Sequence, residues 1–199
     1  MSTDFLRLPA TLRARLEREL RPRERLVYAG LPSPWRTMLP ALPLFVFGLF
    51  WTSISGFVGV LFAGLLLGYG PSPPPVPLWL AGVASIVGML FVLFGVLVLA
   101  SPFYRWLKAR RTVHAVTDAR LLTVVDAPWR AVESVEKGIT SVQRKDIADG
   151  AGTLRIGHGT ERDAEGVAVE IVSWWRGIPD VERAEDAVRA LVRRRGSGA

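Results

Sequence analysis

An uninterrupted stretch without a charged side chain, from Met38 to Tyr104, constrains this chain more than any other feature. A soluble fold interrupts such a stretch with charges, whereas a helix needs only about 20 apolar residues to cross a bilayer. Prolines divide the stretch at residues 68–77 (GYGPSPPPVP), where a backbone without hydrogen bonds could not remain in lipid. We therefore predict a membrane segment, residues 37–104, with helices at about 38–67 and 78–100 and an external proline-rich loop at 68–77.

The charged residues on either side of this stretch predict its orientation. Residues 1–36 carry eight arginines against four acidic residues, residues 101–199 carry 17 basic and 14 acidic residues, and the loop has no lysine or arginine. By the positive-inside rule, we expect both termini in the cytoplasm and the loop outside. Because the net charge of +7 flanks the apolar stretch, we do not expect nucleic acid as a partner.

The two predicted spans contain no ionisable residue, which removes the main support for a transporter or channel mechanism. Their glycines could let the two helices approach closely. We interpret the spans as a helical hairpin that anchors the protein. The glycines are Gly56, Gly59, Gly64, Gly82, Gly88 and Gly95.

One stretch, ADGAGTLRIGHG at residues 148–159, has the glycine spacing of a phosphate-binding loop. Such a loop needs lysine and then serine or threonine after its last glycine, but His158 and Gly159 follow Gly157. We instead predict a tight turn at Asp149-Gly150, one strand, and a second turn opened by Gly157 and Gly159.

Other catalytic and cofactor patterns are also missing from the sequence. The chain has no cysteine, which excludes disulfides and thiolate metal sites, and its two histidines could not form a metal centre without carboxylates. No nucleophile pattern places a serine beside His114 or His158. We therefore expect no enzyme activity, no catalytic residue, no cofactor and no metal.

The segments outside the apolar stretch predict an α+β protein. In residues 1–36, Leu8, Leu12, Leu16 and Leu20 are spaced four apart, which indicates an amphipathic helix that lies on the membrane surface or docks on the protein. In residues 105–199, a C-terminal helix is predicted over 178–195, with proline and acidic residues at its start and arginines at its end. Six short runs between them predict strands: TVHAVT, RLLTVV, WRAVESV, ITSVQRKDI, GTLRIGH and VAVEIVSW.

Four stretches together resemble the bacterial pleckstrin-homology-like (PH-like) domains that are attached to a pair of membrane spans. They are LRPRERLVYAGLPSP (20–34), HAVTDARLL (114–122), DGAGTLRI (149–156) and GIPDVERAEDAV (177–188). The resemblance implies a seven-stranded, half-open β-barrel capped by a C-terminal helix, in the bacterial inner membrane. It implies no established activity.

Two groups of residues are candidates for contacts. Juxtamembrane basic residues favour an anionic lipid surface, although they could also act only in setting the topology: Arg36, Lys108, Arg110 and Arg111. A second group could form an interaction surface, although its charges could be merely solvated and one tryptophan of the Trp174-Trp175 pair is expected in the core: Arg120, Arg144, Lys145 and Trp175.

The expected function is that of a non-enzymatic integral inner-membrane protein, which displays a cytoplasmic PH-like domain for protein or lipid-surface interaction. The expected partners are membrane lipids and either a protein partner or a second copy of the chain. The alternative is an accessory subunit of a membrane transport or secretion complex, assembled through the two spans.

Overall fold

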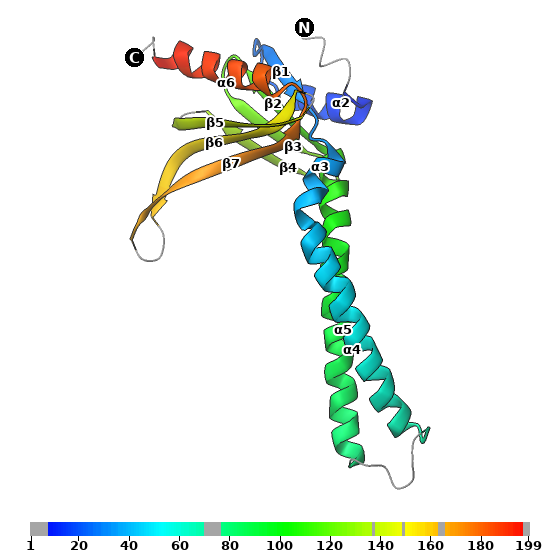
Figure 1. The fold of residues 1–199 in the computed structure, drawn as a ribbon. Coiled ribbons are helices and arrows are strands. Elements are labelled where there is room, and N and C mark those ends of the chain that lie inside the picture. Colours follow the sequence, from blue (N-terminus) through cyan, green and yellow to red (C-terminus); the bar gives the residue numbers. More distant parts are fainter. Residues whose placement is uncertain (1–7, 70–76, 137, 149, 163–165, 197–199) are drawn as a thin grey trace. The chain divides into compact units, whose positions relative to one another are not determined.

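A computed structural model describes residues 8–69, 77–136, 138–148, 150–162 and 166–196 (Figure 1). The chain divides into two compact units. One unit combines Met1–Thr37 with Trp106–Ala199, and the other is Met38–Arg105. The folded domain predicted at 105–199 is therefore completed by residues from before the apolar stretch.

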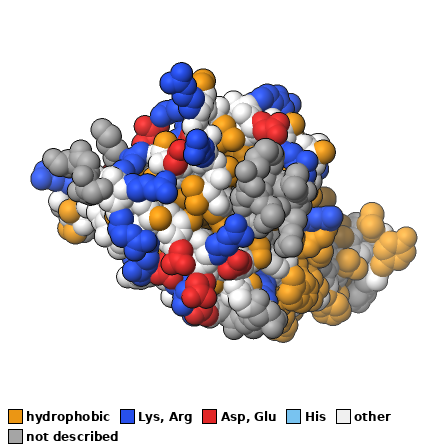
Figure 2. All heavy atoms as spheres, turned by 90° about the horizontal axis from the view of Figure 1, so that it is seen from above, with side chains coloured by type: hydrophobic (Ala, Val, Ile, Leu, Met, Phe, Trp, Pro, Cys, Tyr) orange, Lys and Arg blue, Asp and Glu red, His pale blue; other side chains and the backbone are white. Residues whose placement is uncertain are grey.

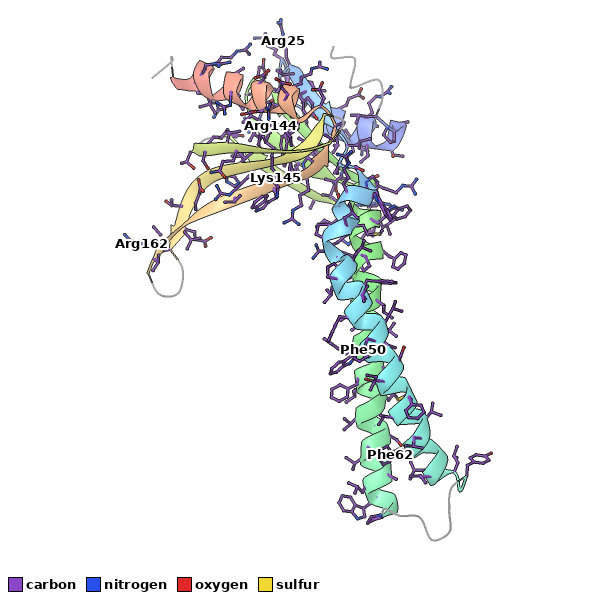
Figure 3. The ribbon with its side chains drawn as sticks, viewed as in Figure 1. Arg25, Phe50, Phe62, Arg144, Lys145 and Arg162 are labelled. Atoms are coloured by element: carbon purple, nitrogen blue, oxygen red, sulfur yellow. The ribbon has the colours of Figure 1, made fainter. Side chains whose placement is uncertain are left out.

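The second unit consists of long apolar helices. The 3-10 helix η1 (Leu39–Ala41) leads into α4 (Leu42–Leu66), and α5 (Leu78–Arg110) continues beyond Ala100, where the predicted span ended. Two helices are long and apolar enough to cross a membrane. Most of their large apolar side chains are exposed, unlike those of a core helix, and Figure 3 shows Phe50 and Phe62 along α4. Most of the predicted loop lies outside the described residues.

Glycines bring α4 and α5 together at two levels. A Cβ atom on Gly88 would lie 3.1 Å from the Cα atom of Gly59, and one on Gly95 would lie 2.1 Å from Oγ1 of Thr52. At Gly56, Gly64 and Gly82 the corresponding positions are open. Close packing between small residues is the usual way for apolar helices to associate in lipid.

In its described residues the first unit contains seven strands in two antiparallel sheets, which confirms the α+β class. The first sheet has the order β1 (Leu26–Gly30), β2 (Thr112–Thr117), β3 (Leu121–Val125), β4 (Ala131–Val135). The second has the order β5 (Ile139–Ala148), β6 (Ala151–Arg162), β7 (Ala168–Ile178). Within the described residues no strand pairing joins the two sheets, so they are not closed into a barrel.

Strand β1 was not among the six predicted strands. It pairs with β2, and Gly30 lies opposite His114 across this pairing. Since β1 precedes the apolar helices and β2 follows them, the helical hairpin is an insertion between two neighbouring strands of one sheet.

The N-terminal helix α2 (Ala10–Glu19) docks on the protein, which decides between the two positions left open for it. Leu12 and Leu16 are buried, and Leu16 packs with Val113, Leu122 and other apolar residues of the first sheet. Helix α2 thus covers one face of β2 while the main core covers the other. This explains why every residue of β2 is buried and why its sequence does not alternate.

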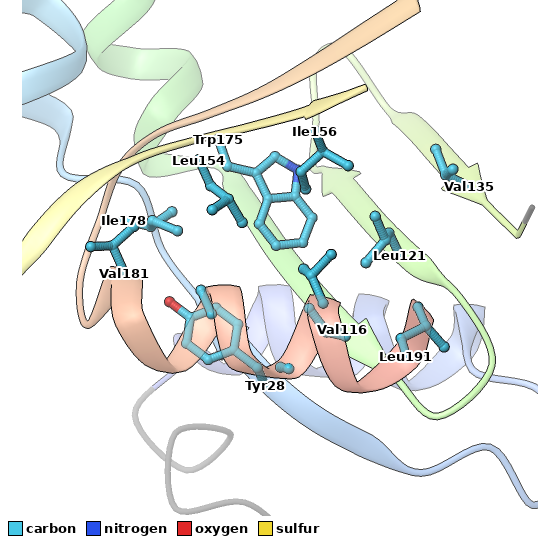
Figure 4. Close-up of a cluster of buried hydrophobic side chains, with 13 residues drawn as sticks. Tyr28, Val116, Leu121, Val135, Leu154, Ile156, Trp175, Ile178, Val181 and Leu191 are labelled. Atoms are coloured by element: carbon cyan, nitrogen blue, oxygen red, sulfur yellow. The ribbon is translucent and has the colours of Figure 1, made fainter. Parts of the chain in front are cut away.

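The main core lies between the two sheets and α6 (Val181–Gly196), which packs on β1, β2, β5 and β6 (Figure 4). The predicted apolar face of the C-terminal helix is buried at Val181, Ala184, Val188 and Leu191, and Val192 is half-buried. Tyr28 of β1 is also buried here, and its hydroxyl donates to the carbonyl oxygen of Pro179 at 2.7 Å. A strand from before the apolar helices therefore contributes directly to the core.

The glycines of residues 148–159 allow backbone conformations and close approaches, and one of the two predicted turns is different in the structure. Gly150 has φ +71° in the turn between β5 and β6, as predicted, while its neighbour Asp149 lies outside the described residues. The second turn, predicted at Gly157 and Gly159, is wrong, because β6 continues to Arg162. Gly159, with φ +70°, instead lies in an irregularity of the β6–β7 pairing between Gly157 and Thr160.

At Gly152 the surrounding atoms leave no room for a side chain. A Cβ atom here would lie 2.6 Å from the carbonyl oxygen of Lys145 and 2.8 Å from Cγ1 of Val181. The glycine therefore lets β6 pass between β5 and the start of α6.

Candidate functional site

Arg120, predicted on an interaction surface, is buried and paired with the carboxylate of Glu24. Its Nε donates to Oε1 of Glu24 at 2.9 Å, and its Nη2 donates to Oε2 at 3.0 Å and to the carbonyl of Glu19 at 2.6 Å. Burial alone raises the pKa of Glu24, but hydrogen bonds from Arg120, the Arg21 N–H and Thr117 outweigh it and hold this pKa below its usual value. Arg120 thus fastens the N-terminal segment to the domain.

Trp175, which was predicted on an interaction surface, lies instead in the core. Its side chain is 2% exposed within the main core (Figure 4). The ring also stacks on that of His114, with centroids 4.8 Å apart. Its neighbour Trp174 is 50% exposed on the opposite face of β7. The expectation that one tryptophan of this pair belongs to the core is therefore confirmed, and Trp174 is the one available for contacts.

Arg144 and Lys145 lie on β5, away from Arg162 at the outer end of the β6–β7 hairpin (Figure 3). Arg144 forms ion pairs with Asp146 and with Glu185 of α6, each at 3.1 Å. Lys145 is exposed. The two residues do not form a common basic site with Arg120, because that guanidinium is buried against Glu24.

The juxtamembrane residues occupy two places in the first unit. The guanidinium of Arg110 lies 4.7 Å from the ring centre of Trp106, and Arg111 donates to the carbonyl of Ala127, while Lys108 is exposed. Arg36 lies on α3 (Pro34–Met38), where its Cβ is 3.0 Å from the position of a Cβ on Gly177. The backbone N–H of Ser33 donates to the carbonyl of Gly177 at 2.7 Å. Helix α3 is thereby fixed to the end of β7.

Two Trp-Arg pairs are carried by the segments that this contact joins, one on α3 and one on β7. They are Trp35 with Arg36 and Trp174 with Arg176. Trp35 is 58% exposed, and two guanidinium groups lie near the ring centre of Trp174, that of Arg176 at 5.5 Å and that of Arg155 at 6.0 Å. The sequence singled out Trp174-Trp175-Arg176, but only the structure identifies the outward-facing members.

The two arginines beside Trp174 differ in their partners. Arg155 donates to Oε2 of Glu170 at 2.8 Å, and hydrogen bonds from Thr140, Ser141 and Arg155 lower the pKa of this glutamate. Arg176 is exposed, and in the described part of the chain it has no carboxylate within ion-pair distance. Among the described residues, therefore, no carboxylate neutralises its positive charge.

A serine, a histidine and a carboxylate meet between the two sheets. Oγ of Ser173 lies 2.7 Å from Nε2 of His158 and donates to Oε1 of Glu133 at 2.5 Å. In a nucleophilic triad the histidine stands between serine and acid and takes the serine proton. Here the serine proton points to the carboxylate, so the cluster links β4 to the second sheet and does not match that arrangement.

Charges of both signs are mixed on the surface of the first unit. Figure 2 shows Lys and Arg side chains interspersed with Asp and Glu on the face seen from above. Among the described residues no group of three or more His, Asp or Glu side chains could hold a metal ion.

The second unit carries a groove of about 420 Å³ between α4 and α5. Small residues account for much of its lining, and the open position at Gly56 faces no neighbouring atom within 4 Å. The lining residues are Gly56, Gly59, Val60, Ala63, Ser85, Gly88, Met89 and Val92.

Comparisons with known proteins identify no relative. No family model matches the chain, and no match is found among curated proteins or among solved structures. The function is therefore inferred from the geometry described above.

Proposed function

We propose that this chain is a non-enzymatic integral protein of the bacterial inner membrane, whose apolar helices anchor a cytoplasmic PH-like domain for interaction with a protein or lipid surface. The observation that carries the proposal is the pairing of β1 with β2 around the inserted helices. Because strands on both sides of the hairpin form one sheet, the hairpin returns the chain to the side of the membrane from which it left.

The PH-like assignment is supported by the order of the elements. In the part of the chain that the structure describes, seven antiparallel strands in two sheets precede the C-terminal helix, which packs on strands of both sheets. This is the number of strands and the position of the helix that the resemblance implies. The hydroxyl of Ser173 donates to Glu133, so this cluster differs from a nucleophilic triad, in which the serine donates to the histidine.

An experiment on membrane topology tests the proposal. The chain has no cysteine, so single Ser72→Cys and Ser197→Cys variants can be labelled in intact cells with a membrane-impermeant maleimide. We expect labelling of Ser72→Cys in intact cells and of Ser197→Cys only after lysis. Release of the protein from membranes by alkaline carbonate, or labelling of both sites in intact cells, would contradict the proposal.

The groove between α4 and α5 favours the second candidate, an accessory subunit of a transport or secretion complex. In this case the groove receives a helix of the partner, since small residues allow close helix packing in lipid. A Cβ atom at Gly56 would meet no atom within 4 Å, so Gly56→Leu would project into the groove, and Gly82→Leu, also at an open position but outside the groove, is the control. A membrane protein that co-purifies in mild detergent and is lost only with Gly56→Leu would support this candidate.

A further inference from the structure

We propose that two copies of this chain associate through β7, whose unpaired edge forms an antiparallel pairing with the β7 edge of the second copy. The pairing is centred on Ser173 and joins the three-stranded sheets of the two copies into one sheet of six strands. The inference deepens the proposed function and rests on it, because it names the partner of the binding domain. All the residues that carry it belong to the folded unit of Met1–Thr37 and Trp106–Ala199.

The first reason is the unpaired edge of β7. This strand is the last in the order β5-β6-β7, so along one side its backbone has no strand partner among the described residues. An edge strand that carries apolar side chains is a template for pairing with another chain. Val169, Ile171 and Trp174 of β7 are 49%, 41% and 50% exposed. The strand therefore offers both hydrogen-bonding groups and apolar surface to a partner.

The second reason is where this edge ends. Gly177 has φ +64°, and its carbonyl accepts a hydrogen bond from the N–H of Ser33, so pairing with another strand cannot continue past Arg176. A strand that pairs antiparallel with its own copy does so symmetrically about one central residue. With Ser173 at the centre, the pairing covers Glu170 to Arg176 and stops before the contact with Ser33.

The third reason is charge complementarity, which selects this register. Glu170 and Arg176 are the charged residues of β7, and they alternate with Val172 and Trp174 along its outer face. A centre at Ser173 places Glu170 opposite Arg176 of the second copy, and Val172 opposite Trp174. Opposite charges and pairs of an aromatic with a β-branched residue both stabilise neighbouring strands. A shift of the centre by one residue moves every pair by two positions, and then no carboxylate faces an arginine.

Both charged groups can make this contact. Arg176 is exposed and has no carboxylate within ion-pair distance in the described part of the chain. Glu170 accepts hydrogen bonds from Thr140, Ser141 and Arg155, and a carboxylate has about four acceptor positions. Directly opposite residues of an antiparallel pair have Cβ atoms only about 5 Å apart, a distance that an arginine side chain spans.

The same complementarity favours a second copy over a different protein as the occupant. The outer face of the strand carries its own complement, because its four residues meet the same four in reverse order. Two-fold symmetry is the commonest symmetry of soluble oligomers, and each contact of such a dimer occurs twice. The ion pair and the Val172–Trp174 pair are therefore both doubled.

The test is the oligomeric state of the full chain in mild detergent, measured by sedimentation equilibrium. We expect a dimer whose dissociation constant rises at least about tenfold in Arg176→Glu, which corresponds to about 1.4 kcal/mol, because two attractive pairs become two repulsive ones. Arg193→Glu is the matched control, since it reverses the same charge at an exposed position on α6. It should dimerise like the parent, and thermal midpoints show that the variants are folded.

A mixture of two variants tests the register. Glu170→Arg and Arg176→Glu should each dimerise weakly alone, whereas an equimolar mixture should dimerise like the parent, because every glutamate then faces an arginine. If Glu170→Arg does not fold, Ser173→Cys decides, since the chain has no cysteine and centrally paired residues lie within disulfide distance. Oxidation should give a covalent dimer of Ser173→Cys but not of Lys145→Cys, which lies exposed on β5 at the other edge of the sheet.

Four results overturn the proposal: a monomeric parent chain, a dimer that Arg176→Glu does not weaken, a mixture that stays monomeric, or a covalent dimer of Lys145→Cys without one of Ser173→Cys. A dimer that is lost with Gly56→Leu but not with Arg176→Glu also overturns it and assigns the association to the groove between α4 and α5. In each of these cases, labelling of Ser72→Cys in intact cells and of Ser197→Cys only after lysis leaves the proposed function standing.

Discussion

Glu24 and Arg120 form a buried ion pair, with Nε of Arg120 2.9 Å from Oε1 of Glu24, although 96 positions and both apolar helices separate them in the chain. The pair joins the segment before the helices to the β2–β3 turn after them. The same turn binds the backbone of Arg25, because Asp118 accepts from its N–H at 2.9 Å and donates to its carbonyl at 3.0 Å. The N-terminal segment is thus an integral part of the domain.

Removal of one member of this ion pair should destabilise the domain strongly. Arg120→Met leaves the Glu24 carboxylate buried without its partner, and we expect a loss of about 3–5 kcal/mol in the free energy of unfolding. The double variant Glu24→Gln/Arg120→Met should recover part of this loss. Unfolding in mild detergent, followed by circular dichroism, measures both effects.

The control for this prediction is the ion pair of Arg189 with Glu185 on α6, in which the arginine side chain is 54% exposed. Arg189→Ala should change the free energy of unfolding by about 0.5 kcal/mol or less. Equal losses for Arg120→Met and Arg189→Ala would show that the buried pair has no special role.

His114 should make the domain less stable in acid. Burial lowers the pKa of His114 from 6.5 to about 3, so the unfolded chain binds a proton on this residue at a higher pH than the folded chain does. The contribution of neutral His114 to the free energy of unfolding is fully present above pH 6.5. It falls between that pH and about pH 3, by about 1.4 kcal/mol for each pH unit. In His114→Phe, which retains a ring beside Trp175, this part of the pH dependence should disappear.

The measurement for His114 is the thermal midpoint as a function of pH, for the parent and for His114→Phe. Carboxyl groups titrate in the same range in both proteins, so the difference between the two curves isolates the histidine. Parallel curves over this range would contradict a neutral, buried His114.

Packing between the two apolar helices should depend on Gly88. A leucine here would meet the backbone of Gly59, since even a Cβ atom would lie 3.1 Å from its Cα, and we expect a loss of about 1–3 kcal/mol. Gly82→Leu, on the same helix but facing open space, should have little effect. The thermal midpoint in detergent compares the two variants, and a similar loss for both would exclude a specific α4–α5 contact at Gly88.

The domain should fold without its membrane segment only when both of its parts are present. We expect a chain in which residues 38–105 are replaced by a flexible linker of about 15 residues, with a mean reach of roughly 20 Å, to be soluble and folded. Residues 106–199 alone lack β1, α2 and Glu24, and should aggregate through the exposed edge of β2. Gel filtration and amide chemical-shift dispersion distinguish these outcomes, and equal folding of the two shortened chains would refute the prediction.

The sequence predicted the elements whose patterns are local. The apolar helices, the β5–β6 turn at Gly150 and the buried face of α6 follow from hydropathy, glycine and helical periodicity. Strand β1 was missed because five residues give a weak pattern and its partner β2 lies beyond the entire helical hairpin. Gly157 and Gly159 were read as a turn because glycine favours turns and bulges alike, and only the pairing with β7 distinguishes them.

The residues of the candidate site were harder to predict than the fold. Trp174 and Trp175 are adjacent, and alternation along β7 shows that they face opposite sides without showing which side is the core. Arginine is usually a surface residue, which is why Arg120 was predicted on a surface. Its burial depends on Glu24, 96 positions away in the chain. Arg36 was predicted near the membrane from its place in the sequence, but its neighbour Gly177 comes from a distant strand.

The insertion of the helical hairpin between β1 and β2 has a consequence for biosynthesis. During translation β1 leaves the ribosome before either apolar helix, and it has no partner until β2 has been made. If a single helix crossed the bilayer, the two halves of one sheet would be on opposite sides and could not pair. For a chain anchored as proposed, folding of the domain therefore reports on membrane insertion, because only an even number of crossings lets β1 pair with β2.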